Sequence, residues 1–259
     1  MKLEVYSSQS DGVSVKNKVS KAVKEFSRFA NEYNNYNIIQ AEVAKTLVEQ
    51  LPSRKYSTII DVGAGSGEVY KNIEKENISF EQFIALDSSQ EMLDIHPSHQ
   101  NIKKIYADFN IDKTFEKFTT NSNSVVLSSS ALQWSRDLDF TLSMLSKKSP
   151  ESHFAMFTAA TFKTLHQVAG VKSPIYSEDK LKEIINKYYN SSAPQLRKYS
   201  LYFDSVREMF RYIKRSGVNG GEKNLSYKQM KHIMKVYPLN YLEFEVLFIK
   251  VDSLCFRNP

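Results

Sequence analysis

The sequence predicts an α/β protein with a mostly parallel sheet flanked by helices. Two patterns support this: short β-branched and aromatic runs alternate with segments of helical length, and glycines cluster directly after the first run. The 259 residues are 41% hydrophobic and 25% charged, which is enough apolar material for one sizeable core. Because no repeat or low-complexity linker divides the chain, we expect a single domain over residues 1–259.

The first segment, residues 1–52, is predicted to be a helical extension. Apolar residues recur at helical spacing from Val19 to Ala30. After a polar break, a second helical pattern runs to Leu51, and Pro52 stops it.

Five segments then have the composition of buried strands. They are Tyr56–Val62, Phe83–Leu86, Ile102–Ala107, Ser124–Ser128 and His153–Thr158. Connections of helix length separate the first four, as in βαβ units of a parallel sheet.

The pattern changes after Ala160, where we expect a helical insertion over residues 160–197 that includes a helix at Leu181–Tyr189. The remaining elements are two late strands, Lys198–Phe203 and Leu242–Val251, with two helices between them, Ser205–Arg215 and Ser226–Tyr237.

Composition excludes several classes of protein. No apolar run approaches the roughly 20 residues that span a bilayer, and the N-terminus lacks the apolar core of a secretion signal. Cys255 is the only cysteine, and the five histidines show no metal-binding spacing. We therefore expect a cytoplasmic protein that binds neither a metal nor a membrane.

Three of the eight glycines lie between the first strand and the helical segment Glu68–Lys75, at Gly63, Gly65 and Gly67. Glycines there permit a tight turn and close approach of a ligand to the backbone. The dinucleotide fingerprint would place its last glycine at Glu68, and Asp61 precedes the turn. A carboxylate repels a pyrophosphate but accepts hydrogen bonds from an ammonium group, which favours S-adenosylmethionine, a nucleoside without phosphate, as the ligand.

Two further acidic residues follow predicted strands. Asp87 ends the second strand, where a carboxylate can accept hydrogen bonds from both ribose hydroxyls. Asp108 ends the third strand, where it can meet the amino group of adenine. Each acid alone is a weak signal, because aspartate at a strand end often only caps the next helix.

These motifs resemble those of the class I S-adenosylmethionine-dependent methyltransferases. The resemblance covers about residues 56–157 and includes Asp61-x-Gly63-x-Gly65-x-Gly67, Leu86-Asp87-x-Ser89-x-x-Met92-Leu93 and Ala107-Asp108. It implies a Rossmann-like sheet of seven strands, the last of them antiparallel.

Further segments resemble the malonyl-[acyl-carrier protein] O-methyltransferases of biotin synthesis. They are Phe26-Ser-Arg-Phe-Ala30-x-x-Tyr33 with Gln40, Ala131-Leu-Gln-Trp134, Phe210-Arg211-Tyr-Ile-Lys214-Arg-Ser-Gly217-Val-Asn219 and Pro238-Leu-Asn-Tyr241. The Leu-Gln-Trp piece also occurs in trans-aconitate methyltransferases. The chain departs from the family after the fifth strand, where Thr158–Leu165 lacks a Gly-Pro pair.

The resemblance assigns residues to two groups. The expected contacts with S-adenosylmethionine are Tyr33, Gln40, Asp61, Gly63, Gly65, Gly67, Asp87, Ser88, Met92, Asp108 and Ser128. The expected contacts with the substrate are Tyr33, Trp134, Arg207, Arg211 and Lys214. No catalytic side chain is expected, because the substrate carboxylate is itself the nucleophile.

Charge indicates the kind of partner. The chain carries a formal charge of +6, and the segment from Arg197 to Lys235 holds ten basic and three acidic residues, 10 − 3 = +7. A basic surface attracts acidic partners, and acyl carrier protein is strongly acidic. The plainer alternative is a solvated face of amphipathic helices.

Three other functions stay open on sequence alone. They are methylation of another small acid such as trans-aconitate, methylation of nucleic acid, and a cofactor-binding assembly factor without turnover. Nucleic acid is disfavoured, because Ser128-Ser-Ser-Ala131 follows the fourth strand in place of an Asn/Asp-Pro-Pro-Tyr/Phe segment.

Overall fold

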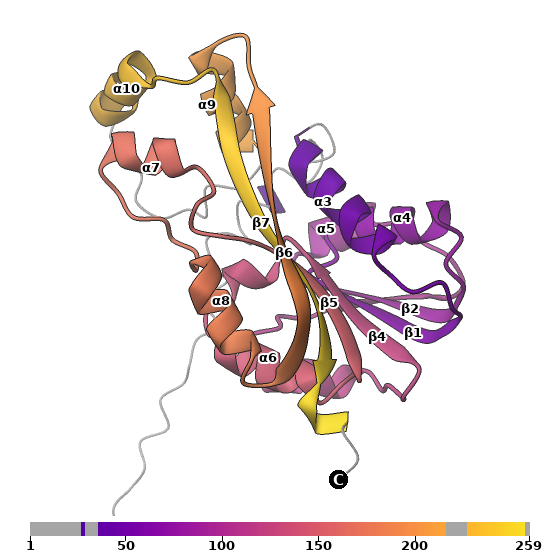
Figure 1. Ribbon diagram of the computed structural model, residues 1–259. Coiled ribbons are helices and arrows are strands. Elements are labelled where there is room, and N and C mark those ends of the chain that lie inside the picture. The colour runs from indigo at the N-terminus through magenta and orange to yellow at the C-terminus, as the bar shows by residue number, and fades with distance from the viewer. Residues whose placement is uncertain (1–26, 29–35, 216–226, 257–259) are drawn as a thin grey trace, which may run out of the picture.

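A computed structural model describes residues 27–28, 36–215 and 227–256, and in them the chain forms one seven-stranded sheet in the order β3-β2-β1-β4-β5-β7-β6 (Figure 1). The strands are β1 (Tyr56–Val62), β2 (Phe80–Asp87), β3 (Ile102–Tyr106), β4 (Ser124–Ser129), β5 (Glu151–Phe157), β6 (Tyr189–Tyr202) and β7 (Tyr241–Ser253). The α-helices are α3 (Ile38–Glu49), α4 (Glu68–Lys75), α5 (Gln90–Ile95), α6 (Leu138–Ser146), α7 (Lys163–Ala169), α8 (Glu178–Ile185), α9 (Val206–Arg215) and α10 (Tyr227–Val236). Three short 3₁₀ helices are η1 (Asp112–Lys117), η2 (Leu132–Trp134) and η3 (Leu254–Phe256).

Strand direction agrees with the predicted α/β class. The pairs β1–β2, β1–β4, β2–β3 and β4–β5 are parallel, whereas β7 is antiparallel to both β5 and β6. The expected antiparallel last strand is thus confirmed. The two edges of the sheet are β3 and β6, and the register of β6 shifts between Ser192 and Gln195.

The sheet is covered on both faces because successive residues of its buried strands point to opposite sides. Ile59 of β1 packs with α3 and α4, and Ile60 packs with α6 and α8. A third cluster joins α3, α7, α9 and Tyr237, the residue after α10, to the extended ends of β6 and β7, which Figure 1 shows rising beyond the rest of the sheet.

Most of the expected elements are confirmed. β1 and α4 have the bounds that the sequence predicts, and α9 and α10 lie within one residue of theirs. The helix expected from Val19 to Ala30 lies outside the described residues except for Ser27 and Arg28, which are helical.

The expected extent of the helical insertion is wrong. Its helices end at Ile185, and β6 begins at Tyr189, nine residues before the predicted strand. The first half of β6 contains asparagine, serine and proline, which have low strand propensity. Its pairing with β7 supplies the ladder that the local sequence does not specify.

A cluster of charged residues joins the amino end of β5 to its neighbours. Glu151, which is 8% exposed, accepts hydrogen bonds from Arg54 Nη2 at 2.6 Å and His153 Nε2 at 2.8 Å. Lys250 Nζ of β7 lies 3.2 Å from Glu151 Oε1, the oxygen that also accepts from His153. Burial raises the pKa of Glu151, but His153 and Lys250 outweigh burial and lower the pKa to about 2.

Membrane-spanning helices and metal-ligand clusters are both absent from the residues that the structure describes. No helix among them is long and apolar enough to cross a membrane. They also contain no group of three or more histidine, cysteine, aspartate or glutamate side chains placed to hold a metal ion.

Candidate active site

A cavity opens at the carboxyl ends of the parallel strands. Strand order reverses at β1, which lies between β2 and β4, and ligands of open α/β sheets bind at such a point. The cavity encloses about 870 Å³, part of it open to solvent. It is lined by Gln40, Ala44, Asp61, Gly63, Ala64, Gly65, Ser66, Glu68, Val69, Asp87, Ser88, Ser89, Met92, Phe109, Asn110, Ser129, Ser130, Ala131 and Trp134.

The glycine loop after β1 forms one wall for two different steric reasons. Gly63 has φ +77°, and a Cβ atom there would lie 2.2 Å from the Cβ of Ala131, so this glycine lets the β1 and β4 loops touch. Gly65 has φ +52°, and a Cβ there would meet no atom within 4 Å. Gly65 therefore presents bare backbone to the cavity.

Gly67 is predicted to contact S-adenosylmethionine, whereas in the structure it allows close packing at the start of α4. It does not line the cavity, and a Cβ there would lie 2.6 Å from Pro97 Cδ. The residue begins α4 and lets this turn pack against the segment after α5.

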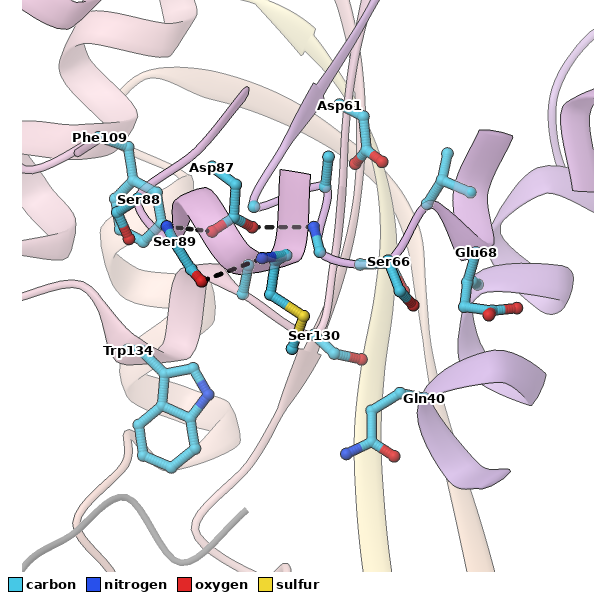
Figure 2. A pocket seen from close by; sticks show the side chains of 18 of the residues that line it. Gln40, Asp61, Ser66, Glu68, Asp87, Ser88, Ser89, Phe109, Ser130 and Trp134 are labelled. Carbon is cyan, nitrogen blue, oxygen red and sulfur yellow. Dashed lines mark hydrogen bonds between the residues drawn. The ribbon is translucent and has the colours of Figure 1, made fainter. Parts of the chain in front are cut away.

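Asp87 holds together the turns that follow β1 and β2. Its two carboxylate oxygens accept hydrogen bonds from the backbone N–H groups of Gly65 and Ser89, each at 2.8 Å (Figure 2). Burial raises the pKa of Asp87, and these backbone hydrogen bonds oppose the rise. Each oxygen keeps a lone pair for a donor in the cavity, such as a ribose hydroxyl.

Asp61 is the most unusual group in the cavity. It is 1% exposed, and neither carboxylate oxygen has a hydrogen-bond partner among the described residues. Burial and the nearby charge of Asp87 raise the pKa of Asp61 well above its ordinary value. An unpaired buried carboxylate is destabilising, so the site fits a cationic group such as the ammonium of S-adenosylmethionine.

A second wall comes from the segment after β4. Ser129 and Ser130 line it, and the buried hydroxyl oxygen of each lacks a hydrogen-bond partner in the described part of the chain. Trp134 of η2 also lines the cavity, and Figure 2 draws Ser130 between Trp134 and Gln40 in this view. This wall is neutral, in contrast to the acidic wall after β1 and β2.

α3 and α4 close the cavity on a third side. Asn37 Nδ2 donates to Glu68 Oε1 at 3.2 Å, and Lys71 Nζ lies 2.7 Å from the same oxygen. Gln40 is 6% exposed, and its side-chain carbonyl oxygen has no partner among the described residues. The second predicted helix thus packs beside the glycine loop.

The cavity brings together eight of the residues predicted from sequence. They are Gln40, Asp61, Gly63, Gly65, Asp87, Ser88, Met92 and Trp134. Tyr33 lies outside the described residues. The roles of these residues toward a ligand stay predictions.

Asp108 and Ser128 do not line the cavity, which corrects their expected positions. Asp108 pairs with Arg136 Nη2 at 2.6 Å and accepts from Asn110 Nδ2 at 2.6 Å. The hydroxyl of Ser128 is buried and donates to the backbone oxygen of Val62 at 2.7 Å, so it links β4 to β1. Their neighbours in sequence, Phe109, Asn110, Ser129 and Ser130, reach the cavity instead.

The expected basic contacts also lie elsewhere. Arg207 and Arg211 are exposed, one helical turn apart on α9, and neither lines the cavity. Met209, Tyr212 and Ile213 form the buried face of the same helix. The side chain of Lys214 lies outside the described part of the structure. Direct contact of the two arginines with a ligand in this cavity is therefore not supported.

Sequence reasoning missed several lining residues. Ser66 and Glu68 lie within or next to the glycine loop, so their position was a usable signal. Ser129 and Ser130 had a weaker signal, because three consecutive serines end β4 and only geometry tells which of them face the cavity.

Comparison with known proteins agrees with this geometry. Residues 60–148 match the family model described as "Methyltransferase domain". A malonyl-[acyl-carrier protein] O-methyltransferase of Calditerrivibrio nitroreducens is 21% identical in an alignment of 248 positions, which covers 89% of this chain and 97% of that protein.

Solved structures share the fold at low sequence identity. A Bacillus halodurans protein described as a candidate methyltransferase has a TM-score of 0.59 and 9% identity, over 82% of this chain and 98% of that one. Phosphoethanolamine N-methyltransferase 2 of Haemonchus contortus, solved with S-adenosyl-L-methionine, has a TM-score of 0.54 and 13% identity, over 92% of this chain and 61% of that one. The sheet order, the cavity and these matches describe the same architecture.

Proposed function

We propose that this chain, which carries a class I methyltransferase domain, transfers a methyl group from S-adenosylmethionine to the free carboxylate of a malonyl thioester on acyl carrier protein. The product is the malonyl methyl ester used in biotin synthesis. The choice of substrate is supported by the malonyl-[acyl-carrier protein] O-methyltransferase that aligns along most of both chains. The use of S-adenosylmethionine is supported above all by one observation, the unpartnered carboxylate of Asp61 in the cavity.

The cavity walls divide the binding of the methyl donor among several residues. Asp61 would accept hydrogen bonds from the ammonium group, and Asp87 would accept them from the ribose hydroxyls. Met92 and Phe109 are 2% and 8% exposed, and they offer apolar surface for a purine ring.

The proposed reaction requires no general base. When bound, S-adenosylmethionine supplies an electrophilic methyl group, which a carboxylate oxygen takes as the carbon–sulfur bond breaks. A carboxyl with an ordinary pKa near 4 is already ionised at neutral pH. The protein then acts by aligning the reactants and excluding water from the cavity.

Acyl carrier protein would dock outside the cavity. Arg207 and Arg211 of α9 are exposed, as are Lys231 and Lys235 of α10. An exposed basic surface steers an acidic protein through long-range attraction that salt screens. On this proposal the two arginines contact the carrier protein, while the thioester arm reaches the cavity.

The direct test incubates the purified protein with S-adenosylmethionine and malonyl-acyl carrier protein and follows the carrier by intact-mass spectrometry. We expect a mass gain of one methylene group, and no gain with acetyl-acyl carrier protein, which has no free carboxylate. Trans-aconitate and malonyl-coenzyme A serve as competing acceptors. Faster methylation of trans-aconitate than of the malonyl carrier would reject the proposed substrate.

Two further measurements separate docking from chemistry. Arg207→Glu/Arg211→Glu should raise KM for malonyl-acyl carrier protein about tenfold, most strongly at low salt, and leave the affinity for S-adenosylhomocysteine unchanged. Lys113→Glu removes an exposed positive charge from η1, away from α9, and serves as the control. In cells, the gene should rescue a biotin auxotroph that lacks the malonyl methyltransferase.

A further inference from the structure

Two serine hydroxyls in the cavity have no role in the function as proposed so far. Ser129 and Ser130 end β4 and begin the next loop, and both line the cavity. Their hydroxyl oxygens are buried and have no hydrogen-bond partner among the described residues. A buried polar group without a partner is destabilising, and a ligand that accepts hydrogen bonds from these hydroxyls would remove this cost.

The backbone of Ser130 is held in an unfavourable conformation. Its φ is +60°, in the left-handed region that is strained for residues other than glycine. Its N–H donates to Ala155 O at 2.8 Å, and its carbonyl accepts from Gln133 Nε2 at 2.7 Å. The surrounding structure thus fixes the backbone on both sides, and the hydroxyl alone is left without a partner.

The charges of the cavity indicate which ligand group these hydroxyls suit. Asp61, Glu68 and Asp87 line it, and no lysine, arginine or histidine does so in the described part of the chain. A ligand carboxylate therefore finds no cation in the cavity and must be held by neutral donors. Serine hydroxyls can donate to a carboxylate without adding charge beside the acidic wall.

The cavity offers two places for a carboxylate. One is the glycine loop, where Ser66 is 2% exposed and its hydroxyl has no partner among the described residues. This loop directly follows Asp61 along the chain, so the amino-acid end of the methyl donor suits it. The other is at Ser129 and Ser130, which line the cavity with Trp134; Figure 2 draws Ser130 and Trp134 below Asp61 and Asp87 in the view.

We propose that Ser129 and Ser130 form a subsite that binds the substrate carboxylate and positions it for methylation. The inference rests on the proposed function, because it takes the acceptor to be a carboxylate. The two hydroxyls donate hydrogen bonds to one carboxylate oxygen, and the other oxygen stays free to attack the methyl carbon. The pair determines specificity for a substrate that ends in a free acid.

Ser130→Gly and Ser129→Ala are the test variants. Glycine removes the hydroxyl and also relieves the left-handed strain, so Ser130→Gly should fold at least as well as the wild type. The matched control is Ser128→Ala, which removes the adjacent hydroxyl that bonds to Val62 rather than to the cavity. Ser66→Ala tests the glycine loop in the same way.

The experiment measures two affinities for each variant. The first is the affinity for S-adenosylhomocysteine. The second is the affinity of the S-adenosylhomocysteine-loaded protein for malonyl-N-acetylcysteamine relative to its affinity for acetyl-N-acetylcysteamine. Calorimetry measures both. Ser130→Gly and Ser129→Ala should each reduce the preference for the malonyl probe about tenfold and raise KM for malonyl-acyl carrier protein by a similar factor. Their affinity for S-adenosylhomocysteine should stay within twofold of wild type, as should both affinities of Ser128→Ala.

Two outcomes would overturn the inference. If both serine variants weaken S-adenosylhomocysteine binding and keep the malonyl preference, the hydroxyls hold the carboxylate of the methyl donor. If neither affinity changes, the hydroxyls bind no carboxylate. Failure of the proposed function looks different: the wild type would then not methylate malonyl-acyl carrier protein. The subsite still stands in that case if the malonyl preference exists and Ser130→Gly removes it.

Discussion

Two buried acids at opposite ends of the sheet have opposite surroundings. Glu151, at the amino end of β5, is held by Arg54, His153 and Lys250, and the pKa of Glu151 is lowered to about 2. Asp61, near the carboxyl end of β1, has no partner among the described residues, and its pKa is raised. A paired acid stabilises the fold, whereas an unpaired buried acid destabilises it and is available to bind a ligand. The comparison assigns stability to the amino end of the sheet and ligand binding to the carboxyl end.

The largest expected effect follows from Asp61→Asn, which should change stability and binding in opposite directions. We expect the affinity for S-adenosylhomocysteine to fall roughly 100-fold, about 3 kcal/mol, because the ammonium loses its buried carboxylate. The ligand-free variant should melt at a higher temperature than wild type. Calorimetry and thermal melts check the two signs, and a variant that is less stable without ligand would contradict the assignment.

The pH dependence of the same variant sharpens the test. The pKa of Asp61 is raised in the folded state, so this acid lowers stability little below the ordinary pKa near 4, and its destabilising effect grows as pH rises toward the folded pKa. The melting advantage of Asp61→Asn should therefore be small in acid and grow toward neutral pH. In the wild type, S-adenosylhomocysteine binding should release a proton, which calorimetry in buffers of different ionisation enthalpy detects.

Two glycine substitutions at the carboxyl end of the sheet should affect the free energy of unfolding and ligand affinity to different degrees. Gly63→Ala places a Cβ 2.2 Å from that of Ala131 at φ +77°, and we expect a loss of about 3 kcal/mol in the free energy of unfolding. Gly65→Ala meets no atom, so its loss should be about 1 kcal/mol, from strain at φ +52° alone. Gly65→Ala should nevertheless weaken S-adenosylhomocysteine binding more than it lowers stability. Equal denaturation midpoints for the two variants would contradict this steric reading.

Glu151→Gln tests the amino end of the sheet. Because Arg54 and Lys250 are partly exposed, we expect a modest loss, about 1–2 kcal/mol at neutral pH, with unchanged affinity for S-adenosylhomocysteine. The lowered pKa of Glu151 gives stability that is present above about pH 4.5 and lost as pH falls toward about 2. The difference from wild type should thus shrink in acid, opposite to the trend for Asp61→Asn. Urea denaturation at several pH values measures it.

Asp87→Asn should have a small effect on stability, similar to that of Gly65→Ala. An amide has one acceptor oxygen, so one of the two backbone hydrogen bonds from Gly65 and Ser89 is lost, at about 1 kcal/mol. Unlike Asp61→Asn, this variant should lower the melting temperature of the ligand-free protein. Denaturation of the two variants side by side checks the opposite signs, and an increase in melting temperature for both would remove the distinction between the two acids.

The elements of the fold also differ in how far the sequence predicts them, as β1 and α4 differ from β6. Tyr56–Val62 and Glu68–Lys75 are predicted to the residue, because a buried apolar run, a glycine turn and an amphipathic helix each have a local signature. β6 is not, because its first half forms through pairing with β7 and has little strand propensity of its own.

The side chains of the cavity also differ in how far the sequence predicts their positions. Asp61 and Asp87 were predicted because strand ends fix where their carboxylates lie. The sequence prediction names Ser128, whereas Ser129 and Ser130 line the cavity, because the direction of a hydroxyl depends on packing between β4 and β1 that the sequence does not specify. Asp108 accepts a hydrogen bond from Arg136, which lies 28 positions away in the chain, and the local sequence does not predict this pair.

The edges of the sheet have a consequence for crowded solutions. An unpaired strand edge is a template on which a second chain can extend the ladder and start an aggregate. β3 is five residues long and carries Lys103 and Lys104, whereas β6 is fourteen residues long but contains Pro194 within its register shift. Proline has no N–H to donate and the shift twists the strand, so the long edge cannot be copied in register along its length. Pro194 lies in the half of β6 that the sequence does not predict as a strand, and this proline opposes edge-to-edge assembly of the protein.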